Sequence, residues 1–379
     1  MKKIAYITNH SSFFESHISP IAVSAKAKGF KVKLFCGQGG SKIMEKYAKK
    51  TLKKKNIDVS KHKFTASGIN FVNEFFIFLN FFNSVKKYRP DIIHAATPKG
   101  IIYGGLTSLI LKTKCTIIFV SGLGFLFSNK LNFYEKIVKI IYINFSKLLF
   151  KKKNLHLIIE NKRDLTYYKN RFDLEGRIKL LNGSGVDLNK FKPSNKLKKK
   201  IVLMPSRVLK EKGVTEFSKA TKILLKKHKD WRFIVLGSLD YGKSSSYTKK
   251  ELQELKNDGL IFLNYKNNIS FYLKKCSIVC LPSYREGFSK TLSEAVACGI
   301  PIVTSNIHGC KELVFNGKTG ILCEPKNHVS LSNKLDKLIT NKNLRNFLSK
   351  NGPKIAKKKL DVKIIVNENI SLYFKLLKK

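Results

Sequence analysis

The sequence lacks several features that would place the protein in a familiar class. Its seven cysteines form no C-x-x-C pair, and no histidine and cysteine group has metal-ligand spacing, so we expect no metal site. No uninterrupted apolar run reaches about 18 residues, so we predict no membrane-spanning helix. The opening MKKIAYITNH has too short an apolar stretch for the core of a signal peptide. The odd cysteine count, mostly in apolar runs, predicts buried free thiols in a reducing cytosol.

Arginine and acidic residues are also scarce. Only eight of the 74 basic residues are arginine, and 25 acids leave a formal net charge of +49. A lysine excess of this kind is more often a base-composition bias of the genome than selection for a ligand. The resulting field still favours anionic partners such as nucleotides, nucleic acid or an acidic membrane. Nucleic-acid binders concentrate basic and aromatic residues on one element, whereas these lysines are spread through every segment, so we expect no nucleic-acid partner.

Short β-branched runs alternate with amphipathic helical patterns along the whole chain. This alternation predicts parallel sheets with helices on both faces. The length suits two domains, and the lysine-rich KPSNKLKKK separates two series of strands. We therefore predict an α/β protein with two doubly wound domains, residues 1–193 and 194–365, facing each other across a cleft, with a terminal helix over 366–379. Ligands of such sheets bind at the carboxyl ends of the strands.

The segment MPSRVLKEKG follows the first strand of the second domain. Arg207 and Lys212 lie five residues apart in this post-strand loop, where both can reach one anion. A guanidinium binds two oxygens in a fork, and an ammonium acts as a point charge. An anion site and two solvated basic residues are equally good interpretations of the segment alone.

The segment YREGFSKTLSEA places Glu286 in a loop and Glu294 in the first two turns of a helix. The pair fits three interpretations: the acid and nucleophile of a hydrolase, two solvated surface residues, or two hydrogen-bond acceptors for one ligand's hydroxyls. Gly287 permits close approach of a ligand to the backbone. The free amides of the helix start, Phe288 to Thr291, suit a diphosphate. A favourable acid near a helix N-terminus explains Glu294 but not Glu286.

Three segments, SRVLKEKG, EGFSKTLSEAVACGIPIV and GCKELVFNGKTGILCEP, together resemble the retaining glycosyltransferases of family 4. The resemblance covers essentially the whole chain and implies the GT-B fold of two Rossmann-like domains. It also implies that the first domain binds the acceptor, the second binds the nucleotide sugar, and the last helix returns to the first domain. The segments VSGLGFLFS and DIIHAATPKG narrow the likeness to enzymes that build capsule, O-antigen or glycoprotein-oligosaccharide precursors on a polyprenyl diphosphate.

The resemblance also implies a role for each donor-side residue. Glu286 would contact the donor sugar, and Glu294 would bind the ribose of the nucleotide. Arg207 and Lys212 would neutralise the departing diphosphate in place of a metal ion, which fits the absence of a D-x-D motif. No cofactor is expected. The other donor-binding residues would be Gly287, Phe288, Ser289, Lys290, Thr291 and Tyr265, the last in a loop that would meet the nucleobase.

These roles favour ligand-binding carboxylates over a hydrolase pair, which would leave Arg207 and Lys212 without a task. The chain departs from the family after the fourth amino-terminal strand, where many members have a histidine and this chain has Val120, Ser121 and Gly122. We therefore expect a leaving phosphate oxygen to take the acceptor's proton if no histidine serves. The acceptor-side candidates are His17, His94, Ser121, Gly122 and Gly124, and each histidine is alternatively structural.

Two segments bear on whether the protein associates with a membrane. Residues 133–154 have apolar residues at helical spacing with lysines between them, which fits equally a helix packed on the sheet or one partly inserted at a membrane surface. Residues 69–82 are similar and favour a core position. A polyprenyl-linked acceptor stays in the bilayer, so we expect a cytoplasmic protein peripheral on the inner face of the membrane. Lys151, Lys152 and Lys153 are expected to contact its anionic headgroups.

We therefore expect a retaining hexosyl or N-acetylhexosaminyl transferase that moves a sugar from a UDP-sugar to a polyprenyl-diphosphate-linked saccharide. Two alternatives stay open. One is a family 4 transferase acting on lipopolysaccharide core or a soluble acceptor. The other is a basic nucleic-acid-binding protein. No motif encodes the identity of the donor sugar.

Overall fold

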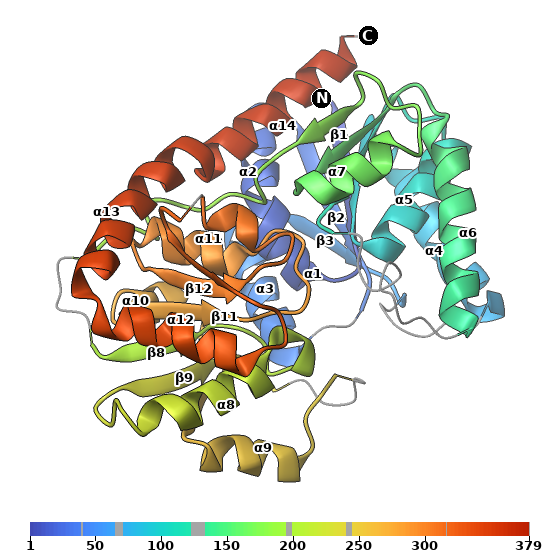
Figure 1. The fold of residues 1–379 in the computed structure, drawn as a ribbon. Helices are drawn as coiled ribbons and strands as arrows, with labels where there is room; N and C mark the ends of the chain where they lie inside the picture. Colours follow the sequence, from blue (N-terminus) through green and yellow to red (C-terminus); the bar gives the residue numbers. More distant parts are fainter. Residues whose placement is uncertain are drawn as a thin grey trace. The chain divides into compact units, whose positions relative to one another are not determined.

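The computed structural model describes residues 1–38, 41–64, 71–122, 133–194, 199–239, 245–315 and 317–378. The chain divides into two compact units (Figure 1), which we call unit 1 (Met1–Ser184 with Lys363–Lys379) and unit 2 (Gly185–Val362). Each unit contains a parallel sheet, as the alternation of strands and helices predicted. The assignment of acceptor and donor roles to residues 1–193 and 194–365 stays a prediction.

Unit 1 is built on a sheet with the order β3-β2-β1-β4-β5-β6-β7. All strands run parallel, and successive strands are added outward from β1 to β3 on one side and from β4 to β7 on the other, so the switch point of this sheet lies between β1 and β4. The strands are β1 (Lys3–Thr8), β2 (Lys31–Cys36), β3 (Asp58–Lys61), β4 (Ile92–Ala96), β5 (Cys115–Val120), β6 (Leu155–Ile159) and β7 (Ile178–Leu180). The helices are α1 (Ser11–Phe13), the π-helical η1 (Phe14–Ile18), α2 (Ser19–Ala27), α3 (Lys42–Lys54), α4 (Phe71–Tyr88), α5 (Pro98–Ile110), α6 (Phe133–Phe150), α7 (Lys162–Lys169) and α14 (Val362–Leu377).

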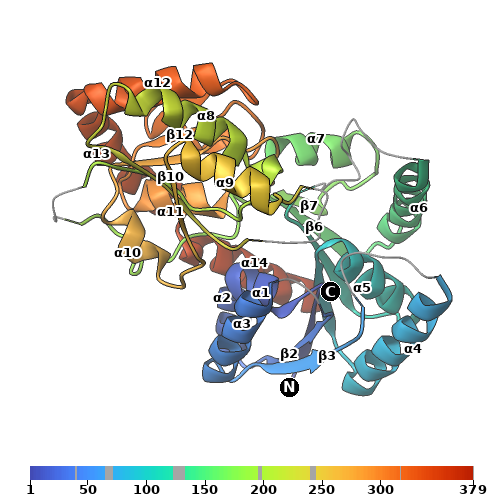
Figure 2. The ribbon, with the colours of Figure 1, turned by 90° about the horizontal axis from the view of Figure 1, so that it is seen from below.

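Both faces of the unit 1 sheet are covered, so alternate residues of each central strand enter different cores. Ile4 and Tyr6 of β1 belong to the core that α2, α3 and α14 complete. Ala5 and Ile7 belong to the core on the other face, beneath α4, α5 and α6 (Figure 2). The backbone of α5 lies very close to the sheet, since a Cβ on Gly104 would come within 2.7 Å of the Ala95 side chain.

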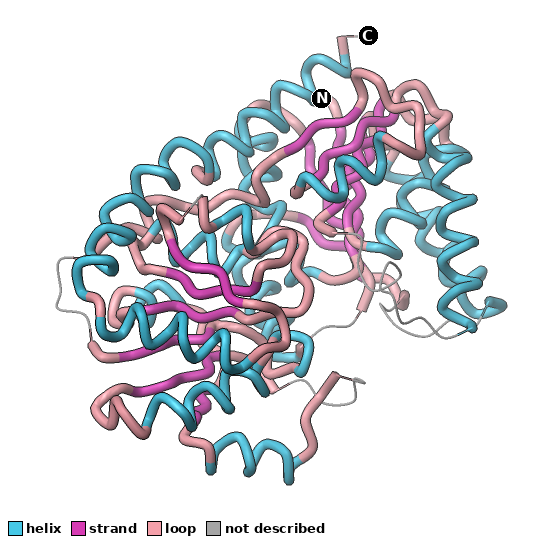
Figure 3. The backbone as a smooth tube through the Cα atoms, viewed as in Figure 1, coloured by secondary structure: helices cyan, strands magenta, loops and turns pink. Residues whose placement is uncertain are grey.

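Unit 2 is built on a parallel sheet with the order β10-β9-β8-β11-β12-β13 (Figure 3, magenta). Its strands are β8 (Ile201–Met204), β9 (Arg232–Leu236), β10 (Leu260–Leu263), β11 (Ile278–Leu281), β12 (Ile302–Ser305) and β13 (Gly320–Cys323). Its helices are α8 (Val214–Leu225), α9 (Lys249–Asn257), α10 (Ile269–Leu273), α11 (Lys290–Ala297), α12 (His328–Thr340) and α13 (Lys342–Lys359), with 3-10 turns η3 (Lys210–Lys212) and η4 (Lys311–Leu313). The strands proceed outward from β8 on one side and from β11 on the other, so β8 and β11 flank the switch point of this sheet.

The final helix belongs to unit 1 although it follows unit 2 in the sequence. Ile365, Ile370 and Tyr373 of α14 are buried in the unit 1 core. The Tyr373 hydroxyl lies 2.6 Å from His94 Nδ1 on β4 and 3.2 Å from the Tyr6 hydroxyl on β1. Three polar side chains of distant origin are therefore paired between α14 and the centre of the sheet, whereas His94 Nε2 has no hydrogen-bond partner among the described residues.

The cysteines, the lack of a long apolar helix and the exposure of residues in α4 bear on the predictions made from the sequence. All seven cysteines are buried and free, as predicted. In the part of the chain that is described, no helix is long and apolar enough to cross a membrane. The expectation that residues 69–82 form core is met only in part, because Phe81 is fully buried whereas Phe75 and Phe76 are each 58% exposed.

Candidate active site

The candidate site in unit 2 lies where the loops after β8 and β11 leave the sheet. These strands are hydrogen-bonded neighbours, and the chain continues from them in opposite directions across the sheet. Doubly wound sheets bind their ligands at the carboxyl ends of the strands at such a switch point. The loop after β8 carries Arg207 and Lys212, and the loop after β11 carries Glu286.

An ion pair joins the two loops. Lys212 Nζ lies 2.7 Å from Glu286 Oε1, and the two side chains are 17% and 15% exposed. The Ser283 hydroxyl donates a second hydrogen bond, of 2.8 Å, to the same carboxylate oxygen. Glu286 is therefore held by one charged and one neutral donor, and its position is fixed before any ligand binds.

Backbone contacts hold the same two loops together. Gly213, which follows Lys212, has φ of 78°, and a Cβ there would lie 2.2 Å from the Pro282 carbonyl oxygen. The Tyr284 amide donates to the Glu211 carbonyl at 2.9 Å. The Tyr284 hydroxyl also lies 2.8 Å from both carboxylate oxygens of Glu216 on α8. Only glycine fits at position 213, because it combines a left-handed conformation with close backbone approach.

A third loop, after β12, supports the turn that contains Glu286. Gly309 has φ of 82°, and a Cβ there would lie 2.2 Å from the Gly287 carbonyl oxygen. The Ser289 amide donates to the Gly309 carbonyl at 3.1 Å, and the Gly309 amide donates to Glu312 at 2.6 Å. The sequence motifs assigned no role to Gly309, Gly213, Ser283 or Tyr284, although the glycines stand in post-strand loops where such contacts are common.

The start of α11 is capped by the protein itself. The Ser289 hydroxyl accepts a hydrogen bond of 3.3 Å from the Leu292 amide, and Ser289 is buried. This contact makes Ser289 an N-cap, so its expected role as a donor-binding side chain has to share the hydroxyl with the helix. Lys290 and Thr291 follow in the first turn, where amides have no partner within the helix. Phe288 packs against the unit 2 core.

Glu294 is a buried carboxylate that the described residues leave unpaired. It is 8% exposed, and no described residue donates a hydrogen bond to its carboxylate or forms an ion pair with it. Burial raises the pKa of Glu294, and the charges of Lys290 and Lys190 oppose that rise. A buried acceptor without a partner is costly, so this carboxylate is suited to accept hydrogen bonds that a ligand supplies.

Arg207 and Tyr265 lie at the same edge of the sheet as the Lys212–Glu286 pair. Arg207 is half-buried in the loop after β8, and this segment packs against the end of β9, because a Cβ on Gly237 would lie 1.9 Å from the Ser206 carbonyl oxygen. Tyr265 is half-buried in the loop after β10. Their roles towards diphosphate and nucleobase stay predictions.

The acceptor-side candidates are distributed over unit 1. His94 is fully buried beneath α14, and burial lowers its pKa to about 3, which favours the structural interpretation of this histidine over an acceptor-side role. His17 lies in η1, stacked on Phe13 with ring centroids 4.3 Å apart, and its Nδ1 is 2.6 Å from the Ser16 hydroxyl. Ser121 and Gly122 follow β5 directly. Gly124 lies outside the described residues.

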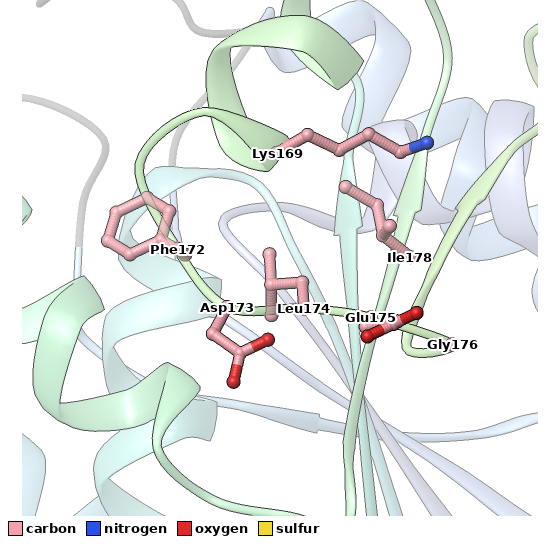
Figure 4. A pocket seen from close by; sticks show the side chains of 7 residues that line it. All are labelled: Lys169, Phe172, Asp173, Leu174, Glu175, Gly176 and Ile178. Carbon is pink, nitrogen blue, oxygen red and sulfur yellow. The ribbon is translucent and has the colours of Figure 1, made fainter.

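One hollow lies apart from this site. It encloses about 380 Å³ in unit 1, in the loop between α7 and β7 (Figure 4). Figure 4 shows Lys169 on one side of the hollow and the carboxylates of Asp173 and Glu175 on the other. The loop enters the amino end of β7, the edge of the sheet away from the carboxyl ends. No group of three or more histidine, cysteine, aspartate or glutamate side chains that could hold a metal occurs among the residues placed by the structure.

Comparison with known proteins gives matches over both units. The model of the family "Glycosyl transferases group 1" matches residues 186–355, and that of "Glycosyl transferase 4-like" matches residues 3–152. The N,N'-diacetylbacillosaminyl-diphospho-undecaprenol alpha-1,3-N-acetylgalactosaminyltransferase of Campylobacter jejuni is 30% identical over 324 residues, covering 81% of this chain and 84% of that protein. The UDP-Gal:alpha-D-GlcNAc-diphosphoundecaprenol alpha-1,3-galactosyltransferase of Escherichia coli is 27% identical and covers 75% of each chain.

Solved structures agree with the fold. The crystal structure of Anabaena HepE in complex with UDP and glucose superposes with a TM-score of 0.79 at 19% identity and covers 99% of each chain. Such a likeness at low identity concerns the fold alone. The predicted GT-B arrangement of two parallel α/β sheets is thereby confirmed.

Proposed function

This chain belongs to the group 1 glycosyltransferases, the retaining family 4, and from that premise we propose that it transfers a sugar from a UDP-sugar to a polyprenyl-diphosphate-linked saccharide. The observation that carries the donor half of the proposal is the Lys212–Glu286 ion pair at the switch point of unit 2. It places a cation and a carboxylate 2.7 Å apart, and Glu286 stands four residues before the start of α11, the helix that carries Glu294.

Each of these groups has a task in breaking the bond between the sugar and the diphosphate. As the anomeric carbon separates from the β-phosphate oxygen, negative charge grows on that oxygen and positive charge on the sugar ring. Lys212 and Arg207 neutralise the diphosphate, and Glu286 faces the sugar. Preorganised charges of this kind stabilise the transition state because they need no reorientation during the reaction.

The ribose and the acceptor complete the scheme. Glu294 accepts hydrogen bonds from the two vicinal ribose hydroxyls, which offsets the cost of its burial. The acceptor hydroxyl attacks the same face of the sugar from which the diphosphate departs, and its proton passes to the leaving phosphate oxygen. Retention of configuration then needs no histidine, in keeping with the sequence Val120-Ser121-Gly122 after β5.

The acceptor half of the proposal is supported by the two relatives described above. Both are named for transfer to a saccharide carried on diphospho-undecaprenol. Such an acceptor resides in the membrane, so we place the protein at the cytoplasmic face of the membrane as a peripheral enzyme.

A panel of UDP-sugars incubated with an undecaprenyl-diphosphate-linked disaccharide tests the function. We expect one UDP-sugar to lengthen the lipid-linked saccharide with an α-linkage, as measured by mass spectrometry and NMR of the released glycan. The same panel with the free reducing disaccharide measures the contribution of the lipid diphosphate. Transfer that is equally fast to the free sugar would contradict the proposed acceptor, and an absence of UDP binding in calorimetry would contradict the proposed donor.

A further inference from the structure

A second hollow lies in unit 1 where α5 and α6 end. It encloses about 350 Å³ and is lined by Leu109, Lys112, Leu148, Lys151, Lys152 and Asn154. Because α5 leads into β5 and α6 leads into β6, the hollow lies at the amino ends of these strands. The candidate residues Ser121 and Gly122 follow the other end of β5, so this hollow is separate from the acceptor-side candidates.

The lining combines three lysines with two leucines and has no acidic residue. Lys152 points into the protein, where its ammonium donates to the Ser108 carbonyl at 2.7 Å and lies 3.2 Å from the Thr116 hydroxyl. Burial lowers the pKa of Lys152 to about 8. This corrects the expectation that Lys151, Lys152 and Lys153 act alike, because Lys152 is held by the fold. Lys112 and Lys151 are exposed at the hollow.

The outer face of α6 leads into the hollow. Ile137, Ile140, Ile141 and Leu148 are 39%, 58%, 50% and 57% exposed, and their spacing places them on one side of the helix. The opposite side is buried through Tyr142, Ser146 and Leu149. The exposed lysines Lys136 and Lys147 are spaced to lie beside the apolar stripe, and the exposed Lys151 directly follows the end of α6. At the end of α5, Ile110 is 57% exposed beside the hollow.

We propose that this face docks on an anionic bilayer, with the phosphate of a lipid headgroup seated between Lys112 and Lys151. The apolar stripe of α6 lies in the interfacial layer, where its isoleucines leave water and its lysines stay near the headgroups. Charge complementarity selects an anionic surface, since every charged side chain of the hollow is a lysine. The docking face is inferred from its own side chains and rests on the proposed function only for its role, which is to bring the enzyme to a membrane-held acceptor.

Vesicle binding tests the proposal with a pair of matched variants. Lys112→Gln with Lys151→Gln removes two charges at the hollow. Lys49→Gln with Lys50→Gln removes two exposed charges from α3, which packs on the other face of the sheet. Each lysine near an anionic surface contributes about 1 kcal/mol, or about fivefold in partitioning. We expect the hollow variant to bind phosphatidylglycerol vesicles about thirtyfold more weakly than the parent, and the α3 variant to bind nearly as well as the parent.

Three results would overturn the proposal. Equal losses for both variants would show that total charge, not the hollow, drives binding. Equal binding of the parent to phosphatidylcholine vesicles would show that anionic headgroups are not required. The third result concerns inorganic phosphate at constant ionic strength. If it displaces the parent from vesicles, and binds the parent but not the variant with Lys112→Gln and Lys151→Gln, the hollow is a site for soluble phosphate.

Leu148→Gln provides an independent arm, because it removes an exposed apolar side chain and leaves every lysine in place. We expect weaker vesicle binding with an unchanged melting temperature and unchanged calorimetric UDP affinity. Sedimentation velocity tests whether the stripe instead binds a second copy of the chain. If the parent is a dimer, and Leu148→Gln is a monomer that still binds vesicles, the stripe is a dimer interface and the proposal is wrong. Slow hydrolysis of UDP-sugar in vesicle-free solution reports on the donor site alone, so failure of the proposed function and failure of this docking face are distinguishable.

Discussion

Lys212 and Glu286 have different partners in the proposed mechanism, yet in the structure they bind each other at 2.7 Å. A diphosphate that engages Lys212 has to draw the ammonium away from the carboxylate or share it. In the proposed mechanism the donor would therefore break one ion pair as it forms another, and the released carboxylate would become available to the sugar. The sequence alone assigned the sugar to Glu286 and the diphosphate to Lys212, and gave no sign that these two side chains pair with each other.

The first prediction follows from that competition. Glu286→Gln removes the charge that holds Lys212, so UDP alone should bind about 1.4- to fivefold more tightly, given that a partly exposed ion pair contributes about 0.2–1 kcal/mol. Turnover should fall, because the donor sugar loses its contact with the Glu286 carboxylate. Calorimetry with UDP measures the first effect and transfer assays the second. Glu324→Gln, an exposed acid elsewhere in unit 2, is the control. Weaker UDP binding by Glu286→Gln would contradict the competition.

The second prediction concerns the removal of the cation. Lys212→Ala should lower turnover by about 2.7–4 kcal/mol of transition-state stabilisation, the usual cost of one preorganised donor. Lys210→Ala, two residues earlier in the same 3-10 turn, is the control, because Lys210 pairs with Glu251. Rates of transfer at saturating donor measure both. Near-normal turnover of Lys212→Ala would show that the anion site is misassigned.

The third prediction uses the burial of Glu294. Its folded-state pKa is raised, so the ionised carboxylate destabilises the unliganded protein, and stability falls as pH rises from about 4.3, the unfolded value, through the folded pKa. Glu294→Gln should remove this dependence and raise the melting temperature at neutral pH relative to acidic pH. The substitution should also weaken UDP binding about tenfold or more, because hydrogen bonds to a charged acceptor contribute about 1.5–3 kcal/mol. If Glu294→Gln binds UDP as tightly as the parent, Glu294 does not bind the ribose.

At the scale of elements, the sequence and the structure agree best where a pattern is local. The strand beginning at Ile201 and the helix beginning at Lys290 could be predicted from β-branched runs and the Ser289 cap. The contact of Gly309 with Gly287 could not be, because it depends on how the loops after β11 and β12 meet. The burial of His94 depends on Tyr373, 279 residues later. Such contacts are set by packing between elements, which no local pattern contains.

The fourth prediction tests the support that the loop after β12 gives to the loop after β11. Gly309→Ala and Gly317→Ala both place a side chain at a φ near 80°, so both incur backbone strain of about 1 kcal/mol. Only the first brings a Cβ within 2.2 Å of the Gly287 carbonyl, whereas nothing lies within 4 Å of position 317. We expect Gly309→Ala to lose far more transferase activity than Gly317→Ala. Equal losses would mean that strain alone, and not displacement of the Glu286 loop, matters.

At the scale of the whole molecule, unit 1 depends on a helix from the far end of the chain. Tyr373→Phe removes the hydroxyl that lies against both His94 and Tyr6, and leaves buried polar groups that cost about 1–3 kcal/mol. We expect a lower melting temperature with unchanged UDP affinity, because the donor residues all lie in unit 2. Phe374→Leu, at a 42% exposed position on the same helix, is the control. Loss of UDP binding in Tyr373→Phe would contradict this separation.

The return of α14 also bears on the order in which the protein is made. Residues emerge from the ribosome in sequence, and domains generally fold as units during synthesis. Unit 2 is one continuous segment, Gly185–Val362, whereas unit 1 requires the last helix, Lys363–Lys379. The residues of unit 1 that precede Gly185 are therefore synthesised before unit 2, and one face of the unit 1 sheet stays without α14 until residues 362–377 have been made. A nascent chain stalled just after Val362 would expose that apolar surface to chaperones while already carrying a complete second unit.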